Sequence, residues 1–127
     1  MDILRWRREE IFGMQLNETD RMALEFNRQA RELLGNRVTD FVISDVIDDP
    51  NHRAFSSTFK AYDFFMVRLN YDRGNFSCCI CTGGIEFGLD NSQKYWDTAD
   101  FDVFFKELKQ EIELRIPDKF LKAKGWL

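Results

Sequence analysis

The chain has 127 residues, of which 44% are hydrophobic and 31% are charged, and its formal net charge is −4. This length fits one domain over residues 1–127, and the hydrophobic share excludes a disordered chain. Thirteen phenylalanines predict a core filled by large rings. No segment approaches the ~18 apolar residues of a membrane span, and the N-terminus has no apolar run typical of a signal peptide, so we expect a cytoplasmic protein with no membrane contact.

The negative charge is concentrated in the middle of the chain. Residues 38–105 contain eleven acidic and five basic residues, a net charge of −6, whereas residues 1–37 are neutral and residues 106–127 carry +2. Such a segment repels the phosphate backbone of nucleic acid and attracts a basic protein, although an acidic surface also serves solubility alone. We therefore expect no direct nucleic-acid binding.

The first half of the chain predicts a helix followed by a strand. Residues 3–16 have apolar side chains in partly helical spacing, interrupted by Gly13, and indicate a short helix or an arm against the core. Residues 17–20 offer cap residues for an amphipathic helix that continues to Leu34 and ends at glycine and asparagine. Residues 38–47 are β-branched and aromatic, as is typical of a strand, and residues 48–51 predict a turn.

The second half predicts a meander of short strands and then two helices. Strands are expected over residues 54–61, 62–71, 76–81 and 85–89, and the last of these is expected to form a hairpin with residues 94–96. Over residues 98–117 the apolar side chains recur every three or four positions, which predicts a helix with one buried face; a shorter helix follows over residues 118–124. The residues of this buried face are Phe101, Phe104, Phe105, Leu108, Ile112 and Ile116.

This order of elements predicts an α+β fold. We expect an antiparallel sheet of about five short strands, with the N-terminal and C-terminal helices packed on one of its faces. No repeat or linker divides the sequence, which agrees with a single domain.

The three cysteines lie in one predicted strand. Cys79 and Cys81 share one face of it and Cys78 points to the other, and neighbours this close cannot form a relaxed disulfide. A structural zinc site needs four ligands, and the sequence has a single histidine, His52. We therefore expect reduced thiols that act as small hydrophobic side chains, with no metal and no cofactor.

No residue pattern in the chain predicts catalysis, so we expect a protein that is not an enzyme. Asp45, Asp48, Asp49 and Glu86 supply carboxylates that could gather magnesium or calcium, but they do not follow the twelve-residue loop pattern of a calcium site. A small metal-dependent hydrolase that uses Asp45, Asp48 and Glu86 stays open as the alternative. A general protein-interaction adaptor is a further alternative.

Tyr95 and Trp96 form a polar and aromatic cluster with two nearby carboxylates, those of Asp90 and Asp97. Aromatic rings beside carboxylates can anchor an arginine or lysine of a basic partner. The same two rings could instead be core residues at the foot of the predicted helix.

From Leu89 onward the chain reads Leu-Asp-Asn-Ser-Gln-Lys-Tyr-Trp-Asp, then the predicted helix, then Arg-Ile-Pro-Asp-Lys-Phe-Leu-Lys-Ala-Lys-Gly-Trp up to Trp126. This last third resembles the C-terminal part of small immunity proteins encoded beside bacterial polymorphic toxins, including contact-dependent growth inhibition systems. The resemblance implies a non-catalytic cytoplasmic inhibitor that binds the C-terminal toxin domain of a cognate effector, often a nuclease such as an RNase.

Together with the acidic middle of the chain, the resemblance implies inhibition by occlusion of the toxin's substrate cleft. Carboxylates would stand where the phosphates of a nucleic acid bind a basic toxin. The toxin-binding residues expected on this basis are Asp45, Asp48, Asp49, Asp90, Tyr95 and Asp97.

Overall fold

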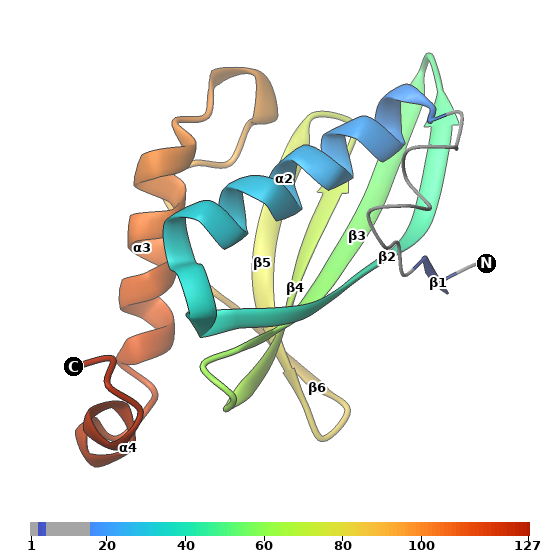
Figure 1. Cartoon of the computed structure of the whole chain (residues 1–127). Helices are drawn as coiled ribbons and strands as arrows, with labels where there is room; N and C mark the ends of the chain where they lie inside the picture. Colours follow the sequence, from blue (N-terminus) through green and yellow to red (C-terminus); the bar gives the residue numbers. More distant parts are fainter. Residues whose placement is uncertain (1–2, 5–15) are drawn as a thin grey trace.

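The computed structural model describes residues 3–4 and 16–127, and it confirms the predicted α+β fold (Figure 1). Apart from Ile3, Leu4 and Leu16, the helix or arm expected over residues 3–16 lies outside the described residues. The elements, with η for a 3-10 helix, are β1 (Ile3–Leu4), α2 (Glu18–Leu34), η1 (Gly35–Arg37), β2 (Val38–Asp49), β3 (His52–Ala61), β4 (Phe65–Asp72), β5 (Asn75–Thr82), β6 (Ile85–Gly88), η2 (Trp96–Thr98), α3 (Phe101–Glu113) and α4 (Asp118–Ala123).

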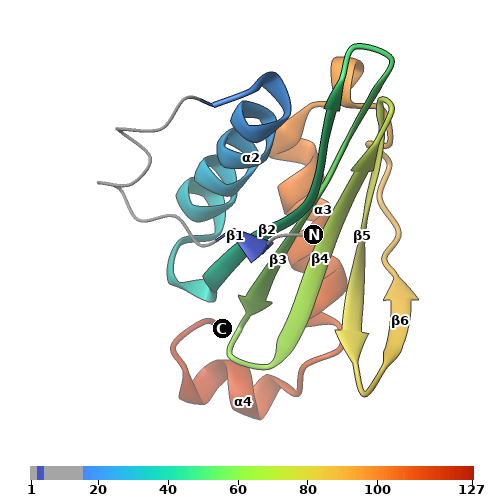
Figure 2. The ribbon, with the colours of Figure 1, turned by 90° about the vertical axis from the view of Figure 1, so that its right-hand side faces the viewer.

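The strands form one antiparallel sheet in the order β1-β2-β3-β4-β5-β6, and α2 and α3 both lie on one face of it (Figures 1 and 2). Side chains alternate between the two faces along each strand. Those that face the helices are buried, for example Phe59, Leu69 and Ile80. We call the opposite face the open face, because no helix among the described residues covers it (Figure 2).

The helix α2 begins and ends where local chemistry predicts. Asp20 N donates a hydrogen bond to Asn17 Oδ1 at 2.7 Å, and Asn17 N donates one to Asp20 Oδ2 at 3.2 Å, which together form a capping box. The helix stops at Gly35, whose φ of 60° suits glycine. On its buried face, Asn27 Oδ1 accepts a hydrogen bond of 2.5 Å from Ser57 Oγ, so α2 is tied to β3 by a polar contact as well as by packing.

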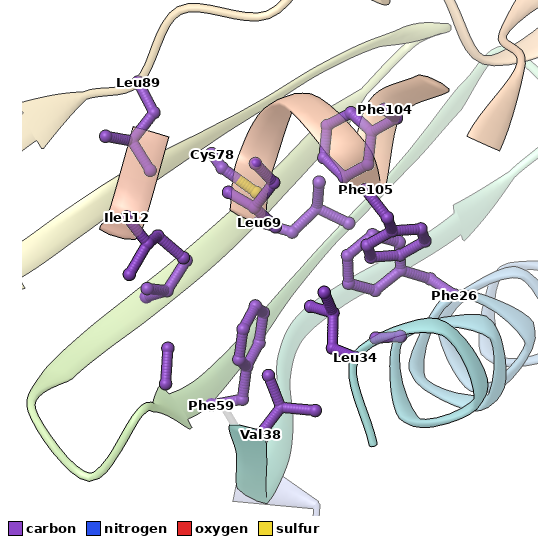
Figure 3. Packing of buried hydrophobic residues seen from close by; sticks show 14 of the residues in the cluster. Phe26, Leu34, Val38, Phe59, Leu69, Cys78, Leu89, Phe104, Phe105 and Ile112 are labelled. Atoms are coloured by element: carbon purple, nitrogen blue, oxygen red, sulfur yellow. The ribbon is translucent and has the colours of Figure 1, made fainter. Parts of the chain in front are cut away.

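Phenylalanine rings from both helices and from the sheet fill the core, as the composition predicted (Figure 3). Phe26 of α2 lies 5.3 Å from Phe105 of α3 between ring centroids, and Phe104 lies 5.0 Å from Phe105. All three rings are at most 1% exposed. The predicted buried face of α3 is confirmed, although Ile116 is buried beyond the end of the helix and Phe101 is half-buried.

For two of the predicted strands, one end lies at a different residue from the one predicted. The strand expected to begin at residue 62 begins at Phe65, because Tyr62 and Asp63 take positive φ values of 59° and 50° and turn the chain. The ring of Tyr62 is fully buried in this turn, and its hydroxyl donates a hydrogen bond of 2.5 Å to Glu113 Oε2. The strand expected to end at residue 47 continues to Asp49, which leaves only residues 50–51 for the turn.

The predicted hairpin between residues 85–89 and 94–96 was also wrong. β6 pairs with β5, and Tyr95 also forms a bridge to Asn75 at the start of β5. Both segments therefore lie along the same edge of β5 and do not pair with each other.

Candidate functional site at the edge of strand β5

The segment between β6 and η2 bulges away from the edge of β5. Leu89 N donates to Cys78 O at 2.9 Å, and Phe76 N donates to Lys94 O at 3.0 Å. The two contact points are two residues apart on β5 but five residues apart on the facing segment. Residues 90–93 must therefore leave the edge, and we call them the 90–93 bulge.

The outer side of α3 holds this bulge in place. Glu107 accepts hydrogen bonds from the N–H and the hydroxyl of Ser92, at 2.6 and 2.7 Å. Asn91 Nδ2 donates to Phe104 O at 3.0 Å, and Asp90 N donates to Glu111 Oε1 at 3.3 Å. The backbone bond from Ser92 is the largest cause that lowers the pKa of Glu107, so this carboxylate stays ionised at neutral pH.

A groove of about 860 Å³ lies between β5, the 90–93 bulge and α3. Its lining contains four carboxylates, those of Asp72, Asp90, Glu107 and Glu111, against one lysine, Lys94, which gives the lining a formal charge of −3. Two of these carboxylates already have a basic neighbour outside the lining, since Arg73 lies 3.6 Å from Asp72 and Arg115 lies 3.6 Å from Glu111. Carboxylate and carboxamide oxygens accept hydrogen bonds, so this lining suits a cationic donor such as an arginine or lysine side chain. The carboxamides in the lining belong to Asn70, Asn75, Asn91, Gln93 and Gln110.

The structure separates the two aromatic residues of the predicted cluster. Tyr95 lines the groove and is 63% exposed. Trp96 instead packs on the core, with its ring centroid 5.4 Å from Phe76 and 5.0 Å from Phe101. Asp90 is exposed in the groove, and its carboxylate has no hydrogen-bond or ion-pair partner among residues 3–4 and 16–127. Tyr95 and Asp90 are thus both available to a ligand.

Asp97 is exposed on η2, next to the groove but outside its lining. Trp96 N donates to Gly74 O at 2.9 Å, which fixes η2 beside the turn between β4 and β5. Asp97 therefore lies at the same end of the molecule as that turn.

Asp48 is exposed, but its carboxylate is bonded to other residues of the fold. Its Oδ1 accepts hydrogen bonds from Thr19 N at 3.2 Å and Thr19 Oγ1 at 2.8 Å, and it lies 3.3 Å from Arg53 Nε. The hydroxyl of Thr19 is the largest cause that lowers the pKa of Asp48. Because Thr19 belongs to the first turn of α2, this carboxylate joins the start of that helix to β2.

Asp45 and Asp49 are exposed on the same strand as Asp48. Asp49 pairs with His52 across the β2–β3 hairpin, and His52 Nε2 lies 3.1 Å from Asp72 Oδ1 at the groove. The tips of the β2–β3 and β4–β5 hairpins lie at the same end of the sheet (Figure 2). The structure thus brings Asp90 and Tyr95 together and places Asp49 and Asp97 at the adjoining end, whereas Asp45 lies farther along β2.

The residues of the hydrolase alternative do not meet. Asp45 and Asp48 are on β2 and Glu86 is on β6, with β3, β4 and β5 between them. Four steps of ~4.8 Å between neighbouring strands place them about 19 Å apart, far beyond what ligands of one ion can span.

Sequence reasoning missed Asp72, Glu107 and Glu111 as members of the groove. Glu107 and Glu111 are four residues apart on α3, a spacing that places both on one face of a helix. The sequence therefore indicated that these two carboxylates share a helix face, but the same spacing is typical of any solvated helix face and does not by itself predict a groove.

Comparisons of the chain with protein-family models, with curated proteins and with solved structures each find no match. None of the described helices is long and apolar enough to cross a membrane. The groove and its charge are therefore the observations from which a function can be inferred.

Proposed function

We propose that this protein is a cytoplasmic immunity protein that binds and neutralises a basic cognate toxin domain of a bacterial polymorphic toxin or contact-dependent growth inhibition system. The observation that carries the proposal is the groove at the edge of β5, where four carboxylates and one lysine lie beside the exposed ring of Tyr95. In this proposal the protein inhibits by binding and performs no catalysis.

The chemistry of the groove defines the contact. A guanidinium or ammonium group of the toxin enters the groove and donates charge-assisted hydrogen bonds to the carboxylates of Asp90 and Asp72, while Tyr95 offers its ring face to the same cation. A nuclease toxin uses such basic groups to hold the phosphates of its substrate. When the carboxylates of this protein bind those basic groups, the toxin can no longer bind its nucleic-acid substrate. A toxin such as an RNase is thereby inhibited.

The surrounding surface extends the negative field beyond the groove. Asp49 and Asp97 are exposed at the adjoining end of the molecule, and Asp45 is exposed farther along β2. Exposed charges of one sign accelerate the encounter with an oppositely charged partner more than they strengthen the final complex. Asp48 has an indirect part in this proposal, because its bonds to Thr19 keep the β2–β3 hairpin attached to α2.

The test is protection of cells that express the toxin domain encoded beside this gene. The native protein should restore growth, and the double variant Asp90→Lys/Tyr95→Ala should protect much less, because it reverses one groove charge and removes the exposed ring. Glu32→Lys is the matched control: it makes the same charge change on the exposed side of α2, away from the groove, and should protect like the native protein.

Equal protection by the groove variant would contradict the assignment of the groove. Failure of the native protein to protect against that toxin domain would contradict the immunity function itself and would favour a general interaction adaptor.

A further inference from the structure

We propose that Cys79, Cys81 and Glu86 form a binding site for a thiophilic metal ion, with Zn²⁺ as the reference ion. The site lies on the open face of the sheet, where β5 meets β6. It adjoins the groove, because Asn70 of the groove lining lies 4.0 Å from Cys79 Sγ, but the three proposed ligands are not part of that lining. The metal-site proposal therefore does not depend on the proposed immunity function.

The spacing of the three side chains matches that of ligands around one ion. Cys79 Sγ lies 3.8 Å from Cys81 Sγ, and Cys81 Sγ lies 4.0 Å from Glu86 Oε1. Two sulfurs that are each ~2.3 Å from a tetrahedral Zn²⁺ are about 3.8 Å apart, and a carboxylate oxygen ~2.1 Å from the ion is about 3.6 Å from each sulfur. The two thiols are therefore already spaced for a shared ion, and a small rotation of Glu86 completes three ligands.

The backbone produces this arrangement. Cys79 and Cys81 are two residues apart on β5 and so share a face, and Cys81 pairs directly with Glu86 of β6. Gly88 faces Cys79 across the same pair of strands, and a methyl group built on Gly88 would meet no atom within 4 Å. This space leaves the fourth coordination position open to water or to another ligand.

The local charges also suit a divalent cation. Metal binding releases the protons of the two thiols to water, and the resulting two thiolates and one carboxylate carry −3, which a divalent ion reduces to −1. Arg68 faces Cys79 across β4 and β5 and forms an ion pair with Glu86. Its positive charge balances the net charge of −1 that the three ligands and the ion carry together. Arg68 and Cys81 both contact Oε1 of Glu86, so metal binding requires this carboxylate to turn, which lets it bind the ion with one oxygen and keep Arg68 on the other, as supporting groups do in metal sites.

The donor set selects the class of metal. Thiolates favour Zn²⁺, Cd²⁺ and Cu⁺ over Mg²⁺ and Ca²⁺, which prefer oxygen ligands. From the sequence alone we expected no metal at these thiols, and the pairing of β5 with β6 is what places Glu86 beside them. The third thiol, Cys78, is buried on the opposite face and cannot reach the site.

The experiment uses the full chain, reduced and freed of metal, titrated with Co²⁺ and with Zn²⁺ in competition with a chromophoric chelator. Native protein should bind one Zn²⁺ per chain, and Co²⁺ should produce the absorption of sulfur-to-cobalt charge transfer. The double variant Cys79→Ser/Cys81→Ser should lose this absorption and more than about 100-fold in Zn²⁺ affinity, since even supporting residues change affinity by ~10–100-fold. Glu86→Gln should weaken binding by about 10-fold or more and retain the absorption.

Cys78→Ala is the matched control, because it removes the neighbouring thiol from the other face and should leave the affinity and the absorption unchanged. Circular dichroism of each variant checks that the fold is kept. Absence of charge-transfer absorption from the native protein, or equal Zn²⁺ affinity of the native protein and the double cysteine variant, would overturn the proposal.

Discussion

Replacing Phe105 with alanine removes a ring from the contact between α2 and α3. Phe105 is 1% exposed, and its ring centroid lies 5.3 Å from that of Phe26, 5.0 Å from Phe104 and 6.4 Å from Phe101. Phe26 belongs to the other helix, so the substitution opens a cavity between the two helices that cover the sheet.

The expected loss combines three contributions: the burial of the side chain, its contacts with other aromatic rings, and the cavity that remains. Burial of a phenylalanine side chain contributes ~1.5–3 kcal/mol, and an aromatic pair adds ~0.5–1.5 kcal/mol beyond area burial. Because the surrounding rings relax only in part around the cavity, the free energy of unfolding should fall by about 3–5 kcal/mol for Phe105→Ala.

Urea denaturation followed by circular dichroism measures this loss. Phe87→Ala is the matched control, because Phe87 is 49% exposed on the edge strand β6 and its loss should cost less than about 1 kcal/mol. A loss below about 1 kcal/mol for Phe105→Ala, or equal losses for the two variants, would show that the buried face of α3 is assigned incorrectly.

Two further predictions concern chemistry and pH. Purified protein with Mg²⁺, Mn²⁺ or Zn²⁺ should hydrolyse neither RNA, DNA nor phosphate esters, because the carboxylates of the hydrolase alternative lie on strands that are not neighbours, and metal-dependent turnover would contradict a function by binding alone. The bonds from Thr19 lower the pKa of Asp48 below its ordinary value of 3.8, so its stabilising contribution is complete above pH ~4 and is lost as the pH falls through the lowered pKa. Acid unfolding of Asp48→Asn should therefore depend less on pH below ~4 than that of the native protein, and identical pH profiles would contradict the role of this carboxylate.

The helices and the core were predictable because they depend on local periodicity. The three-and-four spacing that includes Phe104, Phe105 and Leu108 specifies a buried helical face whatever surface it meets. The turn at Tyr62 was not predictable in the same way. Its aromatic residue reads as part of a strand, and only the tertiary contact of its ring and hydroxyl with α3 and the C-terminal segment explains its buried position in the turn.

The candidate site was predictable in part. Asp90 and Tyr95 were identified because carboxylates and aromatic rings are close together in the sequence there. The groove itself depends on the register by which Leu89 and Lys94 return to β5, and on the bonds from Glu107 to the 90–93 bulge. Such pairings join segments that are distant in the sequence, and composition and periodicity do not specify them.

In the proposed function, the acidic groove and the adjoining hairpin end attract a basic toxin domain. Binding kinetics against the toxin domain encoded beside this gene, at 0.1 M and 1 M salt, test it most directly. The Debye length falls from ~10 Å to ~3 Å between these concentrations, so the association rate should fall strongly while the dissociation rate changes much less.

Two charge-reversed variants locate the effect. Asp90→Lys/Asp97→Lys changes the groove and its rim, and Asp45→Lys/Asp49→Lys changes the β2–β3 hairpin but keeps Asp48, which bonds to α2. Because Asp49 Oδ1 accepts a hydrogen bond from Asn51 N in the hairpin turn, circular dichroism checks that this variant keeps the fold. Both variants should associate more slowly than the native protein at low salt, and the groove variant should also dissociate faster. Association that does not depend on salt, with native rates for both variants, would contradict the claim and show that the toxin binds elsewhere.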